Sequence, residues 1–208
     1  MRARAWVAWL LLALCAVGVQ AAAPTAALVA RVENEGTGYR VVAEGVVPVD
    51  RSIAWAVLTD YDRFHEFLPG ITSSRVVRTQ GRTRWVSQQG EVRAFFFSLP
   101  LDVVMQVDEE PQSILRIELV SGNVEAMNGE WRVSPAGPGA SPGAGADSAQ
   151  VRLSHNGFYA PRVGRVPRVV MRAMLARQVQ GVLDGYVAEM VRRSRPGAGA
   201  AAPAAARK

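Results

Sequence analysis

The stretch Phe95–Asp108, FFFSLPLDVVMQVD, decides the fold class of this chain. One parity of the stretch is wholly apolar and carries Phe95, Phe97, Leu99, Leu101, Val103, Met105 and Val107. The other parity carries Ser98, Asp102, Gln106 and Asp108, together with Phe96 and Val104. Because successive side chains of a strand point to opposite faces, this pattern predicts a β-strand with one dry and one mostly wet face. Pro100 predicts a bulge or an edge position, a bend that a curved sheet can use.

The chain on both sides of this stretch predicts further strands. Period-two or β-branched patterns cover Tyr39–Val49, Arg75–Thr79, Thr83–Arg93, Ile114–Ser121, Gly129–Ser134 and Gln150–Asn156. Two short helices are expected after the first strand: one from Arg51 to about Thr59, N-capped by Asp50, and a helical turn that ends before Pro69. Strands joined by short turns are mostly antiparallel, so about seven strands form one antiparallel sheet.

A long amphipathic helix is predicted from Val166 to about Arg193, with Pro167 in its first turn, where a missing N–H costs nothing. Apolar residues recur along it at steps of three and four, namely Met171, Leu175, Val179, Val182, Tyr186 and Met190. This stripe has to be buried on the sheet. The sequence therefore predicts an α+β domain in which a curved antiparallel sheet wraps round one C-terminal helix.

Four segments resemble the START/Bet v 1-like, helix-grip (SRPBCC) superfamily, in particular its polyketide cyclase/dehydrase and coenzyme Q-binding branch. They are Ile53–Tyr61, Phe67–Ile71, the Asn128–Trp131 stretch before a strand, and Pro167 with the helix after it. The resemblance covers roughly Tyr39 to Arg193. It implies a cavity between helix and sheet for a hydrophobic molecule such as a lipid, an isoprenoid quinone, a sterol or a polyketide, and it names no single ligand.

The N-terminus has the pattern of a secretory signal peptide. Two arginines precede the apolar stretch Trp6–Val19, and the small-residue segment Gln20–Pro24 follows. The apolar stretch is shorter than the roughly 20 residues of a spanning helix, which favours cleavage near residue 23 and a periplasmic or secreted protein. An uncleaved inner-membrane anchor stays open, as does a lipoprotein at Cys15, although Leu14 before it is larger than such sites need.

The remaining organisation follows from composition. Residues 24–34 are expected to form a linker, and residues 35–194 the ligand-binding domain. The Gly-, Pro-, Ala- and Ser-rich residues 135–148 are expected to be a flexible loop inside it, and 195–208 a disordered tail. Cys15 is the only cysteine, so a chain cleaved after it has no thiol for a disulfide, a nucleophile or a metal site.

Residues expected to line the ligand cavity come from the sheet and the last helix. Thioethers and aromatic rings adapt to irregular apolar ligands, and glycines inside a helix indicate either a gap or a close backbone contact. The candidates are Phe95, Phe97, Met105, Ile117, Trp131, Met171, Met174, Gly181 and Gly185. The alternative is ordinary core packing.

Catalytic candidates are few. His155 shares the parity of Val151 and Leu153, so its side chain is expected to point inward, where it could act as an acid or base. The alternative is a histidine at the end of a strand whose ring is hydrogen-bonded to a carbonyl or to water. Asp60 and Asp62 are expected to cap or turn the backbone. No metal-ligand spacing, nucleophile elbow or phosphate loop is found in the sequence. A ligand carrier without cofactor is therefore favoured; a cyclase/dehydrase-type enzyme or a membrane-tethered interaction module is the alternative.

The charge pattern gives one further expectation. The formal charge is +6, but arginines alternate with acids through the domain, so nucleic-acid binding is not expected. Four arginines gather before and within the start of the last helix, namely Arg162, Arg165, Arg168 and Arg172. Positive charges near a helix N-terminus interact unfavourably with the helix dipole, so helix stability does not explain this placement. Contact with a membrane headgroup or with an anionic group of the ligand is one explanation, and an ordinary solvated face is the other.

Overall fold

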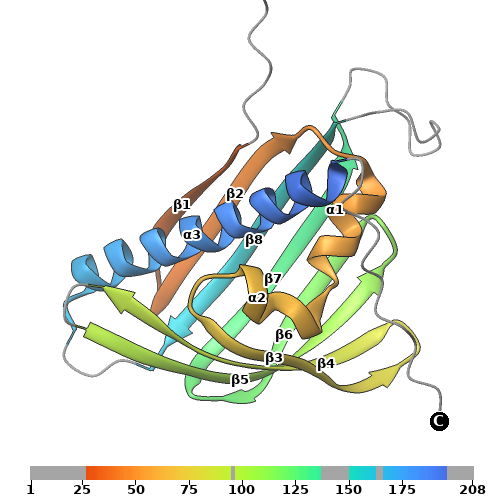
Figure 1. Ribbon diagram of the computed structural model, residues 1–208. Helices are drawn as coiled ribbons and strands as arrows, with labels where there is room; N and C mark the ends of the chain where they lie inside the picture. Colours follow the sequence, from red (N-terminus) through yellow and green to blue (C-terminus); the bar gives the residue numbers. More distant parts are fainter. Residues whose placement is uncertain (1–26, 95–96, 137–149, 163–165, 196–208) are drawn as a thin grey trace, which may run out of the picture.

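An eight-stranded antiparallel sheet curves round one long helix in the computed structural model (Figure 1). The structure describes residues 27–94, 97–136, 150–162 and 166–195. The strand order is β1-β2-β8-β7-β6-β5-β4-β3. The strands are β1 Ala27–Glu35, β2 Gly38–Val47, β3 Ile71–Gln80, β4 Thr83–Ala94, β5 Phe97–Glu110, β6 Ile114–Gly122, β7 Val124–Pro135 and β8 Val151–Pro161. The predicted α+β helix-grip fold is confirmed, with one strand more than about seven.

The additional strand corrects the predicted linker at residues 24–34. Ala27–Glu35 pairs along its whole length with β2, from Ala27 opposite Val46 to Glu35 opposite Gly38. The second half of this strand is rich in polar residues, so the local sequence pattern did not indicate a strand there. Its stability comes from β2 and from the last helix, against which Leu28 is fully buried.

The helix also covers the free edge of β1. The side-chain amide of Gln180 accepts a hydrogen bond from the Ala30 N–H at 3.1 Å and donates one to the Leu28 carbonyl at 2.8 Å. These bonds satisfy main-chain groups that an edge strand otherwise presents to other chains. The helix is thereby fixed to one margin of the sheet.

Helices occupy the concave side of the sheet (Figure 1). Between β2 and β3 the chain forms α1 Arg51–Leu58, the 3₁₀ turn η1 Tyr61–Arg63 and α2 Phe64–Phe67, and it ends with α3 Arg168–Ser194. Asp50 precedes α1 as predicted, but its side chain makes no capping hydrogen bond. Pro167 lies at the N-cap of α3, one residue before the first turn in which it was predicted.

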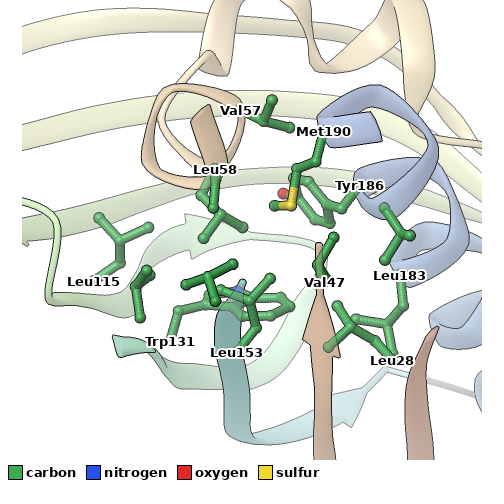
Figure 2. Packing of buried hydrophobic residues seen from close by; sticks show 14 of the residues in the cluster. Leu28, Val47, Val57, Leu58, Leu115, Trp131, Leu153, Leu183, Tyr186 and Met190 are labelled. Atoms are coloured by element: carbon green, nitrogen blue, oxygen red, sulfur yellow. The ribbon is translucent and has the colours of Figure 1, made fainter. Parts of the chain in front are cut away.

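One half of the interior is densely packed. Apolar side chains from α1, α3 and the facing strands meet there, as Figure 2 shows for Leu28, Val47, Val57, Leu153 and Met190. Each of these side chains is at most 2% exposed. We call this region, with Met190 of the last turns of α3, the packed half.

Candidate ligand cavity

The other half of the interior is hollow. A cavity of about 270 Å³ lies between α3 and strands β4 to β8. Its wall is largely apolar, and α1, η1 and α2 contribute Leu58, Tyr61 and Phe64 to it. We call this region the cavity half.

Most of the predicted helix stripe forms one wall of the cavity. Met171, Leu175, Val179, Val182 and Tyr186 all line it, whereas Met190 packs in the packed half. Opposite the helix, the sheet contributes Met105 of β5, Ile117 of β6 and Trp131 of β7. The four predicted ligand residues Met105, Ile117, Trp131 and Met171 therefore face one space.

Other predicted ligand residues lie elsewhere. Met174 is buried but does not belong to the cavity wall. Gly181 and Gly185 lie outside the wall as well, against the turn after α2: a methyl group on Gly185 would lie 2.5 Å from the Phe67 carbonyl oxygen. Gly185 therefore allows a close backbone contact, whereas a methyl group on Gly181 would lie 3.4 Å from the Pro69 side chain. Phe95 lies outside the described residues, and of Phe97 only the main chain is described.

Pro100 lies where β5 leaves its neighbour. It pairs with Glu91 of β4, but the ladder between β5 and β6 begins only at Val103. Its carbonyl accepts a hydrogen bond of 2.8 Å from the Asn123 side chain. Pro100 is exposed and also part of the cavity wall, so the wall reaches the surface beyond the end of β6.

His155 lies in the cavity wall, in the inward orientation that the strand parity predicted. It is 5% exposed, and its Nε2 lies 3.1 Å from the Tyr159 hydroxyl. Its ring lies against that of Trp131, with 4.7 Å between the ring centroids and 39° between the ring planes. Gly129 and Gly157 leave room for this ring, since a methyl group on either would lie within 3.0 Å of an imidazole atom.

Two tyrosine hydroxyls complete a polar cluster in the wall. Tyr159 follows His155 at the same parity of β8 and was missed because the predicted strand ended at Asn156. Tyr186 was predicted only as part of the apolar stripe, and its ring packs edge-on against Trp131 at 5.7 Å (Figure 2). We call His155, Tyr159 and Tyr186 the polar cluster.

Burial keeps this cluster neutral. Desolvation lowers the pKa of His155 to about 4, against a weaker opposing effect of the Glu130 main chain. Burial raises the pKa of Tyr159 to about 12, and burial together with the neighbouring Tyr159 raises the pKa of Tyr186. Near pH 7 all three groups are therefore uncharged hydrogen-bonding groups, well removed from the pKa range of an efficient proton-transfer pair.

The predicted aspartate pair has structural roles. Asp62 accepts a hydrogen bond of 2.7 Å from the Val76 N–H, and Asp60 pairs with Arg193 of α3 at 2.5 Å. Neither residue lines the cavity. Among the described residues, no group of three or more His, Cys, Asp and Glu side chains is placed to hold a metal ion.

The predicted arginine group is divided by the structure. Arg168 donates to the carbonyls of Gly36 at 2.9 Å and Gly38 at 3.3 Å, which ties the start of α3 to the β1–β2 turn. Arg162 and Arg172 are exposed, and Arg165 lies outside the described residues. Contact with a membrane surface stays a prediction. Within the described ranges, none of the helices is long and apolar enough to cross a membrane.

A known sequence family matches this chain. The family described as "Polyketide cyclase / dehydrase and lipid transport" matches residues 47–182, from the end of β2 to the middle of α3. That range includes all of the cavity wall except Leu183 and Tyr186. No curated protein matches the chain in sequence.

Solved structures share the fold at low sequence identity. A STAR-related lipid transfer protein from Xanthomonas axonopodis has a TM-score of 0.62 at 14% identity, over 82% of this chain and 97% of that one. The Zhui aromatase/cyclase from Streptomyces sp. R1128 has a TM-score of 0.60 at 17% identity, over 76% and 96%. A START superfamily protein from Mycobacterium smegmatis has a TM-score of 0.60 at 10% identity, over 74% and 98%. At these identities the likeness shows the fold.

Proposed function

The chain belongs to the polyketide cyclase / dehydrase and lipid transport family, and we propose that it binds and carries a hydrophobic small molecule in the cavity under α3. The observation that carries this proposal is the hollow half of the interior. An apolar stripe of a buried helix normally packs against its sheet. Here five residues of that stripe instead face an apolar space of about 270 Å³.

The size of the cavity restricts the ligand. Cavities of roughly 150 Å³ admit benzene, and small-molecule pockets typically measure about 300–1,000 Å³. A single acyl or isoprenoid chain segment, or a compact ring system, fits this space better than a two-chain phospholipid. Each buried CH₂ group contributes about 0.8 kcal/mol to binding before ordering costs, so a short apolar body suffices for useful affinity.

Titration of a neutral fluorescent probe tests the proposal. N-phenyl-1-naphthylamine is expected to bind the wild-type chain and to brighten in the cavity. Ala126 lies in the wall, so Ala126→Phe fills part of the cavity and is expected to weaken probe binding at least tenfold. Ala188→Phe adds the same ring on the exposed face of α3 and serves as the matched control. Equal probe binding by all three proteins would place the probe outside the cavity and count against the proposal.

A cyclase/dehydrase-type enzyme is the second candidate, since the contact of 3.1 Å between His155 and Tyr159 lies inside the ligand cavity. One structural neighbour is an aromatase/cyclase. The low pKa of His155 speaks for ligand binding over proton transfer. Comparison of the molecules recovered from wild type and from His155→Gln separates the two: a carrier yields the same mass from both, whereas an enzyme yields product from the wild type only.

We also propose that the chain is exported. The charged start, apolar stretch and small-residue segment of residues 1–24 support this proposal. N-terminal sequencing of the protein from the cell envelope is the test. A start at Ala22 or Pro24 supports cleavage and release, and a retained Met1 or Arg2 supports an inner-membrane anchor.

A further inference from the structure

The polar cluster lies in the wall of a largely apolar cavity. His155 and Tyr159 lie four residues apart on β8 and are in contact at 3.1 Å. Tyr186 of α3 contacts the ring of Trp131 (Figure 2), and the ring of His155 lies against the same Trp131. Two opposite walls of the cavity thus each contribute hydrogen-bonding side chains to it.

The Tyr186 hydroxyl has no partner within the described part of the chain. Its side chain is 7% exposed, and it lines the cavity. No hydrogen bond to it is made by any described residue, in contrast to Tyr61, whose hydroxyl donates to Glu109 at 2.9 Å. Among the described side chains, the fully buried polar atom that has no partner is His155 Nδ1, whereas the Tyr186 oxygen stays accessible. Because Tyr186 lines the cavity, its hydroxyl is available to a ligand that fills this space.

The cavity wall also carries little charge. Its described residues include neither Arg nor Lys, and its acid, Glu91, is partly exposed and accepts a hydrogen bond from Ser98. An ionised group buried without a partner of opposite charge is strongly disfavoured. A carboxylate or phosphate at the polar cluster is therefore energetically disfavoured.

We propose, on the basis of the function proposed above, that the ligand is a neutral molecule with an apolar body and a hydroxyl group held by Tyr186 and the Tyr159–His155 pair. The Tyr186 hydroxyl supplies a donor. The Tyr159 oxygen retains an acceptor site whether it donates to or accepts from Nε2 of His155. A ligand hydroxyl matches both groups, whereas a carbonyl uses only the donor.

Paired ring compounds test this assignment. The probes are 2-naphthol and 2-methylnaphthalene, which differ by OH against CH₃, and 2-naphthoate, which is anionic at pH 7. Dissociation constants are measured for wild type, Tyr186→Phe and Tyr159→Phe. The readout is the ratio of the 2-methylnaphthalene constant to the 2-naphthol constant, because this ratio cancels general effects of a substitution on the cavity.

The expected result is a ratio about fivefold lower in Tyr186→Phe than in wild type, the size of one hydrogen bond, with a fall of the same order in Tyr159→Phe. The matched control is Tyr39→Phe, because the Tyr39 hydroxyl contacts the Arg168 carbonyl and Tyr39 does not line the cavity; it is expected to leave the ratio unchanged. We expect 2-naphthoate to bind at least tenfold more weakly than 2-naphthol.

Each other outcome has a definite meaning. If both neutral probes bind with the same ratio in wild type and the two cavity variants, the hydroxyl assignment is wrong while the proposed carrier function stands. If 2-naphthoate binds more tightly than 2-naphthol, the inference that anions are disfavoured is wrong. If none of the probes binds the wild-type chain, the proposed function fails together with the assignment. Thermal unfolding shows that the variants are folded, and either tyrosine variant alone suffices for the comparison.

Discussion

The two halves of α3 lie over the same sheet but meet different surroundings. Around Met190 the helix packs against α1 and fully buried strand residues (Figures 1 and 2). Around Met171 and Leu175 it faces the cavity. One continuous apolar stripe therefore stabilises the fold at its C-terminal end and forms a binding surface towards its N-terminal end. Each part of the stripe either packs in the core or lines the cavity. Which of the two it does depends on whether another element fills the space between that part of α3 and the sheet.

The largest difference between the halves is expected in stability. Leu153 is fully buried in the packed half, so Leu153→Ala is expected to lower the free energy of unfolding by about 2–5 kcal/mol. Ile117 is only partly buried and already faces the cavity, so Ile117→Ala is expected to cost less than about 2 kcal/mol. Urea unfolding of the two variants measures both losses. Equal losses would show that the two halves are packed alike.

The pH dependence of stability tests whether His155, in the wall of the cavity half, is buried and neutral. Its pKa is about 4 in the folded chain, against 6.5 for an exposed histidine. Between these values the unfolded chain binds a proton that the folded chain does not, so stability present above pH 6.5 is lost as the pH falls to 4. The shift corresponds to roughly 3 kcal/mol.

Two histidine variants make this prediction specific. In His155→Gln the free energy of unfolding, measured with urea at a series of pH values, is expected to depend less on pH between 6.5 and 4 than in wild type. In His65→Gln the profile is expected to be unchanged, because His65 is exposed. A profile that is the same in His155→Gln and wild type would contradict the assignment of a buried, neutral His155.

Two glycines of α3 sharpen the comparison at the point where the halves meet. A methyl group on Gly185 would lie 2.5 Å from the main-chain oxygen of Phe67, whereas one on Gly181 would lie at an ordinary 3.4 Å from Pro69. Gly185→Ala is expected to destabilise the chain by about 1–3 kcal/mol. Gly181→Ala is expected to be neutral or to stabilise it by up to about 1 kcal/mol. Thermal and urea unfolding distinguish the two, and a reversed order would contradict the close contact at Gly185.

The fold could be predicted largely from the sequence because its pattern is local. The alternation in Phe95–Asp108 and the stripe from Met171 to Met190 reflect which face is dry, and a local pattern records that directly. The strand β1 was missed because its burial depends on α3, about 150 residues away in the chain. Local periodicity contains no information on such a partner.

The site could be predicted only in part. Met105, Ile117, Trp131 and Met171 were identified because large apolar residues on inward faces must line whatever the interior contains. The stripe has the same period over the cavity and over the packed half, so the sequence does not show where packing ends. The helix glycines were placed in the ligand site because a gap and a close backbone contact have the same sequence signature, and only the position of Phe67 distinguishes them.

The smallest effect on the free energy of unfolding is expected from surface arginines at the start of α3, in the cavity half. Arg168 joins the start of α3 to the carbonyls of Gly36 and Gly38, so Arg168→Ala is expected to cost about 1 kcal/mol. Arg172 is exposed, and Arg172→Ala is expected to change stability by less than about 0.5 kcal/mol. Urea unfolding compares the two. Equal effects would mean that the hydrogen bonds of Arg168 do not hold this end of the helix.

Native mass spectrometry of the chain, purified gently from its own cell envelope, tests the central claim most directly. If the cavity half is a ligand site, the wild-type chain is expected to carry an additional non-protein mass. That mass is expected to be absent from Ala126→Phe, in which the cavity is partly filled, and present in Ala188→Phe. A wild-type chain that carries no additional mass and takes up no neutral hydrophobic probe would contradict the account.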